Sequence, residues 1–262
     1  MASMIGGSTA ERELAALSPW TNPAPVIGAD ERMQRLDRAR TLMAGIGADM
    51  LLIGAGASLR YFTGVAWGAT ERLVAMLLPV QGDPIFICPA FELGSFDASL
   101  GITATDIRLW EEDESPSALV ADALKAAGAS TLAIDPAMAF LFVDRIREAD
   151  PDIRLINGAA VVDGCRMIKS PAEIALMRQA MEMTLEVHRR AAHILHEGIR
   201  ASEVIRFIDA AHRALGASTG NTFCAVQFGR STAFPHGLPQ DDVLREGDVV
   251  LVDTGTLIDG YH

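Results

Sequence analysis

The chain is poor in basic residues and in cysteine. It has 22 Lys and Arg against 34 Asp and Glu, which gives a formal net charge of −12. Nucleic acids and anionic membrane surfaces bind clusters of Lys and Arg, so this balance argues against both as partners. The cysteines at 88, 165 and 224 lie far apart and include no Cys-x-x-Cys pair. Neither a disulfide framework nor a zinc knuckle is therefore indicated, and we expect reduced thiols.

Long apolar runs and several common site motifs are absent as well. No run approaches the roughly 20 apolar residues that cross a bilayer. The chain does not open with the basic, apolar and small-residue progression of a secretory signal, so we expect a cytoplasmic protein with no membrane partner. Neither Gly-x-x-x-x-Gly-Lys-Ser/Thr nor His-Glu-x-x-His occurs. P-loop nucleotide binding and zincin chemistry are therefore not indicated.

What is present is enough apolar sequence for a large core. Half of the 262 residues are hydrophobic and 21% are charged, which argues against disorder and leaves room for two domains. Residues 1 to about 25, with three prolines, are predicted to form an irregular lead-in. Strands are predicted at 50–53, 73–78, 85–87, 107–110, 131–134 and 153–156, and helices near 30–45, 116–127 and 140–149. This alternation indicates a layered α/β domain with a mixed or parallel sheet, at residues 1–160.

The pattern changes after residue 160. Ser170-Pro171-Ala172-Glu173 combines a capping box with a first-turn proline, a strong signal for a helix start. The helix is predicted to end near Gly198. Its predicted apolar side, which also carries His188 as a structural histidine, consists of Ile174, Met177, Met181, Leu185, Ala192 and Leu195. His193, His196 and His212 are assigned to solvated helix faces or ends. A second helix from about 202 to 216, a strand at 223–228 and a terminal hairpin follow. This α+β pattern predicts a second, incomplete domain at 161–262.

Two side chains near the end of the chain are candidates for chemistry. The apolar run Val249–Val252 delivers the carboxylate of Asp253 from the end of a predicted strand, and a rigid strand holds a carboxylate well for a hard metal ion. On this pattern alone, an aspartate that caps a turn at Thr254-Gly255 explains the residue equally well. His236 lies in a loop between Pro235 and Gly237, which favours a site role. One carboxylate does not make a metal site, so we expect its partners beyond residue 262.

Four segments occur in a characteristic order: Arg60–Gly64, Arg166–Ile174, Phe234–Gly237, and Gly247–Gly255 with Asp259-Gly260-Tyr261. In order and rough spacing they resemble successive landmarks of the creatinase/prolidase, or pita-bread, family of metallopeptidases, from about residue 30 to 262. The resemblance implies an α/β N-terminal creatinase-like domain with a mixed sheet, followed by the first part of an α+β pita-bread catalytic domain. It also implies that the N-terminal domain limits substrate size and forms a homodimer.

The same resemblance implies metal-dependent hydrolysis of the Xaa-Pro peptide bond of small peptides, as in a bacterial Xaa-Pro dipeptidase. Asp253 matches the family's first metal-bridging aspartate. His236 matches the histidine that contacts substrate and stabilises the tetrahedral intermediate without binding metal. Two divalent cations would polarise the carbonyl and activate water, Mn²⁺ being expected first and Co²⁺ or Zn²⁺ as alternatives. The remaining ligands would follow Tyr261, so residues 1–262 alone are expected to be inactive.

Two alternatives stay open. The first is another hydrolase on the same fold, either an aminopeptidase P-like enzyme or a creatinase-like amide hydrolase. Asp253 counts against a metal-free version of the latter. The second is a non-catalytic pita-bread binding module, against which the presence of both His236 and Asp253 argues.

Overall fold

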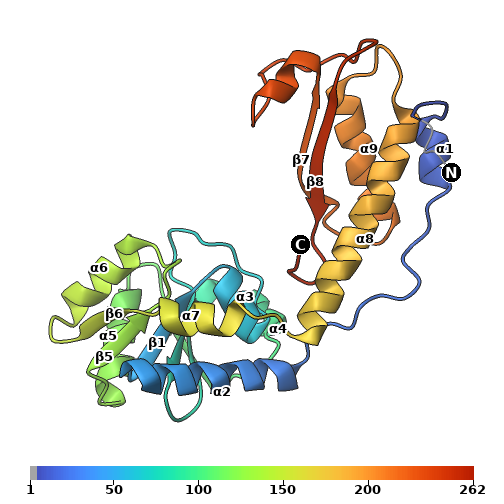
Figure 1. Ribbon diagram of the computed structural model, residues 1–262. Coiled ribbons are helices and arrows are strands. Elements are labelled where there is room, and N and C mark those ends of the chain that lie inside the picture. Colours follow the sequence, from blue (N-terminus) through green and yellow to red (C-terminus); the bar gives the residue numbers. More distant parts are fainter. Residues whose placement is uncertain (1–4) are drawn as a thin grey trace. The chain divides into compact units, whose positions relative to one another are not determined.

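The computed structural model describes residues 5–262, which form two compact units (Figure 1). One unit comprises Ile27–Lys169, and the other comprises Ser170–His262 together with the described residues up to Val26. The chain therefore passes between the units twice. Within residues 5–262, no helix combines the length and the apolar character needed to cross a membrane.

The unit Ile27–Lys169 is built on a six-stranded mixed sheet with the strand order β4-β3-β2-β1-β5-β6. Strand β2 is antiparallel to β1 and β3, and the other neighbouring strands run parallel. The strands are β1 (Met50–Gly54), β2 (Ala75–Pro79), β3 (Ile85–Pro89), β4 (Asp106–Trp110), β5 (Thr131–Ile134) and β6 (Arg154–Asn157). The predicted mixed sheet is confirmed. Central strands β1 and β2 are buried on both faces, which explains their unbroken apolar sequence.

Helices cover both faces of this sheet. One core cluster joins the sheet to α2, α3, α4 and α7, and the other joins it to α5 and α6. The helices are α2 (Ala29–Ile46), α3 (Ala57–Thr63), α4 (Leu93–Ser99), α5 (Pro116–Ala126), α6 (Phe140–Ala149) and α7 (Ala159–Arg166), with a short 3-10 turn η1 (Ala90–Glu92). Gly47 ends α2 in the left-handed conformation, with φ of 66°, and its N–H bonds to the last turn.

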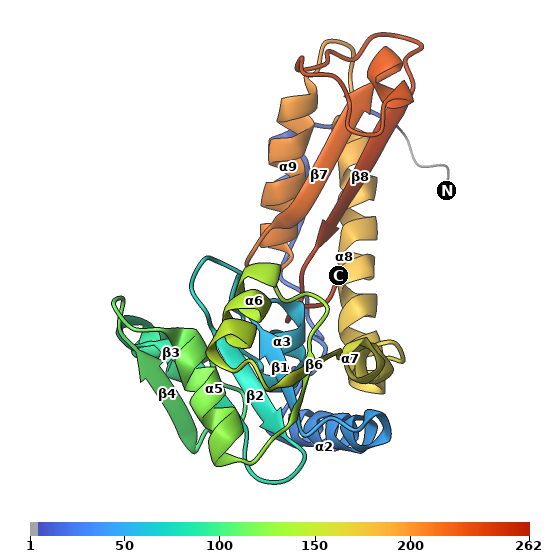
Figure 2. The ribbon, with the colours of Figure 1, turned by 90° about the vertical axis from the view of Figure 1, so that its left-hand side faces the viewer.

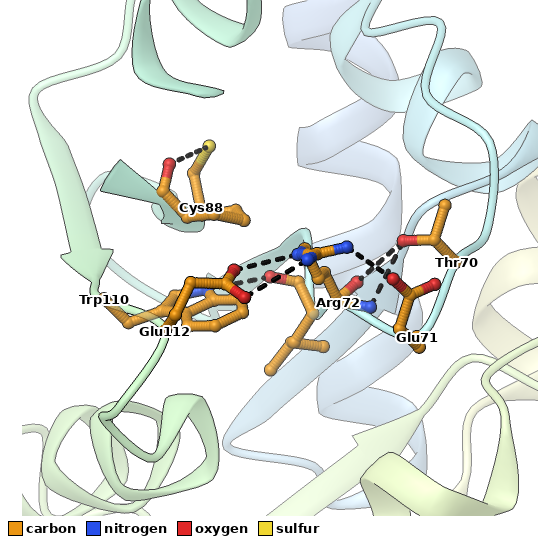
Figure 3. A network of polar contacts seen from close by, with 8 residues as sticks. Thr70, Glu71, Arg72, Cys88, Trp110 and Glu112 are labelled. Atoms are coloured by element: carbon orange, nitrogen blue, oxygen red, sulfur yellow. Dashed lines mark hydrogen bonds and ion pairs between the residues drawn. The ribbon is translucent and has the colours of Figure 1, made fainter. Parts of the chain in front are cut away.

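A polar network ties the segment before β2 to the segment after β4 (Figure 3). Arg72 donates from Nε and Nη2 to the two carboxylate oxygens of Glu112, at 2.9 and 3.1 Å, and also pairs with Glu71. The indole Nε1 of Trp110 donates to the Leu73 carbonyl at 3.2 Å. Because the charged groups are exposed, this network is expected to stabilise the fold only slightly.

The second unit is a helical layer packed on a two-stranded hairpin (Figure 2). Its elements are α1 (Ala10–Ala15), α8 (Pro171–Ile194), α9 (Ala201–Ala214), β7 (Asn221–Phe228), the 3-10 turn η2 (Gly229–Ala233) and β8 (Val250–Thr256). The predicted capping box is present. Ser170 Oγ accepts from Glu173 N at 3.2 Å, and Glu173 Oε2 accepts from Ser170 N at 2.8 Å. These two bonds satisfy amides at the start of α8 that have no partner within the helix.

Two predictions about this unit are wrong. Half of the predicted apolar side of α8 is exposed, with Ile174 at 46%, Met181 at 61% and Leu185 at 59%, while Leu195, just after the helix, packs on the core. The side that packs is the one carrying Leu176, Ala180, Met183, Val187 and Ala191. Both sets recur at helical spacing, and the hairpin and α9 select between them. The N-terminal lead-in is likewise not irregular throughout, because it contains α1, which Thr9 caps by accepting from Arg12 N.

Candidate active site

Asp253 lies in the middle of β8, directly opposite Ala225 of β7. Opposed residues of an antiparallel pair share a face, and neighbours along a strand alternate between faces. Val252 packs towards the helical layer, so Asp253 points to the other face, where it is exposed. The strand continues through Thr254, whose Oγ1 donates to the Phe223 carbonyl at 2.9 Å. The alternative of a turn-capping aspartate is therefore wrong.

His236 lies in an exposed loop that follows η2. The loop is anchored by Gln227, a β7 residue that is only 4% exposed. With its amide oxygen oriented towards Gly237, Gln227 accepts from Gly237 N at 2.7 Å. In that orientation its amide nitrogen donates to the carbonyls of Ser231, at 3.1 Å, and Phe234, at 3.3 Å. One side chain thus holds the segment on both sides of His236.

Strand parity places this anchor on the same sheet face as Asp253. Gln227 is two residues from Ala225 and pairs with Leu251, so its side chain leaves the hairpin on the face that carries Asp253. Gly237 has φ of 70°, and a Cβ at this position would lie 3.1 Å from the end of the Gln227 side chain. A glycine here permits both the turn and the close approach. The structure therefore brings the His236 loop and Asp253 to one face, and sequence reasoning missed the residue that does so.

The charge of Asp253 also affects the pKa values of groups on the helical side of the hairpin. The pKa of His188 is lowered from its ordinary value by burial, and Asp253 opposes that shift. The pKa of the Cys224 thiol is raised by burial first, with Asp253 among the groups that add to the rise.

Two further features of this unit have structural explanations. His212 was assigned to a solvated helix face or a helix end. It lies in the last turn of α9 but is fully buried there, with Nδ1 3.1 Å from the Ile208 carbonyl and Nε2 3.3 Å from Thr184 Oγ1. The segment Gly216-Ala217-Ser218-Thr219-Gly220 has the spacing of a serine-hydrolase motif. It joins helix α9 to strand β7, whereas that motif requires a strand followed by a helix.

Asp253, the predicted metal ligand, does not belong to a cluster of candidate ligands in this part of the chain. Among residues 5–262, no three His, Cys, Asp or Glu side chains lie close enough together to hold a metal ion. Its carboxylate is exposed and its backbone lies within a strand, which suits a hard cation. One such ligand does not complete a site, so these residues by themselves do not fit a metal centre.

Gln227 gives the first testable prediction. Gln227→Leu removes the three hydrogen bonds that this side chain makes to the loop and leaves the Gly237 amide with its bond to the Phe234 carbonyl, at 3.0 Å. We expect exchange in the loop to become at least about tenfold faster, with a loss of stability of about 1–3 kcal/mol. Hydrogen exchange measured by mass spectrometry on peptides covering 229–238 reports this change. Gln240→Leu, an exposed position in the same loop, is the matched control. Equal protection of the loop in both variants would show that Gln227 is not its anchor.

Comparison with known proteins assigns the family. Residues 35–168 match the Creatinase/Prolidase N-terminal domain, and residues 175–262 match Metallopeptidase family M24. The chain therefore belongs to the creatinase/prolidase family of metallopeptidases. The predicted family and the predicted fold class are both confirmed.

Similar proteins include named dipeptidases. The probable dipeptidase PepE of Mycobacterium tuberculosis is 32% identical over 239 residues, which cover 89% of this chain and 62% of that protein. The putative dipeptidase YkvY of Bacillus subtilis is 27% identical over 235 residues, covering 87% and 63%. The crystal structure of dipeptidase PepE from Mycobacterium ulcerans has a TM-score of 0.77 at 30% identity, covering 88% of this chain and 62% of that one. The chain thus spans a little over 60% of the length of these relatives.

Proposed function

We propose that the full-length protein is an M24-type metallopeptidase that hydrolyses the Xaa-Pro bond of small peptides, as an Xaa-Pro dipeptidase does. The observation that carries the proposal is the shared sheet face, on which Asp253 is exposed and over which Gln227 anchors the His236 loop. This face lies within the segment that matches a metallopeptidase family. Relatives named as dipeptidases support a small peptide as substrate.

The chemistry of the substrate favours metal assistance. A peptide bond before proline is a tertiary amide, so a protease that grips the bond through its N–H has nothing to hold. Two divalent cations would polarise the scissile carbonyl and lower the pKa of the attacking water. Asp253 would supply one hard oxygen ligand, which suits Mn²⁺, with Co²⁺ or Zn²⁺ as alternatives. We assign the other ligands to residues outside 5–262, so this stretch alone is expected to be inactive.

His236 has a different role in the proposal. Its exposed loop position leaves the imidazole free to reach a bound peptide, and the Gln227 anchor limits the motion of the loop. We assign it to substrate binding and to donation of a hydrogen bond to the developing oxyanion, without metal ligation. Such donors act most strongly when they are held in place before the reaction.

The assembly and location follow from the same assignment. We propose that the α/β unit, predicted at residues 1–160 and found at Ile27–Lys169, acts as a creatinase-like domain that limits substrate size and pairs two copies into a homodimer. The unit that contains Ser170–His262, predicted to start at residue 161, begins the catalytic domain. The net charge of −12 supports a small-molecule substrate in the cytoplasm over nucleic acid or an anionic membrane.

A cleavage assay on the full-length protein tests the function. We expect manganese-loaded protein to cleave Gly-Pro faster than Ala-Ala, and chelation to abolish both activities. Preference for Gly-Pro-Ala over Gly-Pro would identify an aminopeptidase P-like enzyme instead. Absence of peptide cleavage, with creatine hydrolysed, would identify the creatinase-like alternative. Failure on all substrates with no bound metal would favour the binding module.

A further inference from the structure

The N-terminal residues 5–26 lie outside both family matches, yet they fold with the unit Ser170–His262. They run along α8 in the direction opposite to that helix. Four backbone amides of the segment donate to α8 or to the residues that follow α9: Gly6 N to the Ala192 carbonyl (2.8 Å), Ser8 N to the His193 carbonyl (3.1 Å), Trp20 N to the Leu215 carbonyl (2.9 Å) and Ala24 N to Gln179 Oε1 (2.5 Å). The segment is therefore fastened along its whole length.

Side chains reinforce this attachment. Ala10, Leu14, Leu17 and Trp20 pack against the same apolar core that holds α8, α9 and the hairpin. Burying such groups contributes about 25 cal/mol for each Å² of apolar surface removed from water. The segment thus covers apolar surface of the helical layer that would otherwise face solvent.

A buried carboxylate fixes α1 to α8. Glu13 is only 7% exposed and accepts hydrogen bonds from Arg190 Nη1, at 3.0 Å, and His193 Nδ1, at 3.3 Å. Burial alone would raise the pKa of Glu13, but hydrogen bonds from its partners outweigh burial and hold that pKa at about 2. Arg190 also pairs with Glu186, so the contact is part of a network on α8.

The residue at position 6 has little freedom to change. Gly6 has φ of 78°, and a Cβ at this position would lie 2.7 Å from the Leu195 carbonyl oxygen. That oxygen belongs to the backbone and cannot move aside as a flexible side chain would. Gly7 has a similar φ of 85° with open space around it. Position 6 therefore combines backbone strain for any other residue with a direct clash.

The segment and the hairpin contact opposite sides of the helical layer. Figure 1 shows α8 and α9 between the β7–β8 hairpin and α1. We propose that residues 5–26 are a strap that clamps α8 to α9 and so stabilises the helical layer behind the strand that carries Asp253. The strap also makes a second covalent link between the two units, since the chain leaves it at Val26 to enter the other unit.

Deletion of residues 1–26 from the full-length protein tests the strap. Without it, we expect amide exchange in α9 and in the C-terminal half of α8 to become at least about tenfold faster, because local opening then exposes less apolar surface. Peptides from Ile27–Lys169 should keep their protection. Exchange in α8 and α9 within twofold of the intact protein would overturn the proposal. The readout does not depend on catalysis, so failure of the peptidase proposal leaves this test unaffected.

If the shortened protein does not fold, point variants in residues 5–26 test the strap instead. We expect Gly6→Val to speed exchange in α8 and α9 more than Gly7→Val does, because only the first residue would meet the Leu195 carbonyl. Glu13→Gln should likewise exceed Glu11→Gln, since Glu11 is exposed. Equal exchange in α8 and α9 for the members of both pairs would count against the strap.

The pH dependence of stability provides a separate prediction about Glu13. A carboxylate whose pKa is depressed in the folded state stabilises the fold above its unfolded-state pKa, here 4.5, and that contribution disappears as the pH falls towards about 2. Glu13→Gln should therefore lower the folding equilibrium constant about tenfold at pH 7 in urea titrations, and the difference should shrink below pH 4.5. A difference independent of pH would show that the charge of Glu13 is not what matters.

Discussion

Replacing His236 by alanine in the full-length protein is expected to lower kcat for Gly-Pro by about 10²–10³-fold while leaving the bound metal unchanged. The loss follows because the imidazole is assigned to stabilising charge that develops on the scissile carbonyl. Metal retention follows because the residue is not assigned as a ligand. Steady-state kinetics and metal analysis of the same preparation measure the two quantities together.

His196 supplies the control for this variant. It is exposed like His236, and its Nδ1 lies 2.9 Å from the neighbouring Glu197 carbonyl oxygen. His196→Ala should therefore keep the kcat of the unmodified enzyme. A His236→Ala enzyme with near-normal kcat would reject the role assigned to the loop. Loss of metal together with activity would instead make His236 a ligand.

Replacing Asp253 by asparagine should have a larger effect, because it removes the charge of the ligand itself. Removing groups that only support a ligand weakens metal binding about 10–100-fold, so loss of the ligand charge should cost at least the upper end of that range. Turnover should fall with the metal content. The fold should persist, since Asp253 is exposed and asparagine has nearly the same shape. Metal titration, activity and thermal unfolding of the full-length variant test these three statements.

An exposed aspartate elsewhere controls for the change of charge. Asp122 lies on α5 in the other unit and is exposed. Asp122→Asn should leave metal affinity and turnover unchanged. If Asp253→Asn matched it in both, the carboxylate of Asp253 would not be a ligand, and the peptidase proposal would lose its main support.

The sheet could be predicted closely from sequence, because its strands are short apolar runs bounded by turns. All six predicted strands are present in the unit Ile27–Lys169, with ends displaced by at most two residues. The start of α8 was also predictable, since the Ser170–Glu173 capping box is a local signal. Local patterns suffice where one short stretch of chain determines the structure.

The predictions that failed depended on contacts distant in sequence. Helix α8 has two sets of apolar residues at helical spacing, and only packing on α9 and the hairpin shows that Leu176 is buried and Ile174 is exposed. The N-terminal segment looked irregular because Pro19 and Pro23 interrupt it, while its fastening to α8 joins residues more than 150 positions apart. No local pattern carries that information.

In the candidate site, too, the residues in local motifs were predictable from sequence and the residue that depends on a distant contact was not. Asp253 and His236 stand in recognisable motifs, so the sequence identified them as candidates. Gln227 did not stand out, because a single polar residue in a strand usually faces solvent. Its importance depends on the 229–237 loop folding back over it. A glutamine inside the otherwise apolar end of the strand 223–228 was the one signal that could have suggested a buried anchor.

Anomalous X-ray diffraction from manganese-loaded crystals of the full-length protein tests the central claim most directly. We predict two metal peaks about 3.5–4 Å apart, with carboxylate oxygens of Asp253 in the coordination shell of at least one of them. Metal peaks elsewhere in the molecule, with Asp253 left facing solvent, would contradict the account.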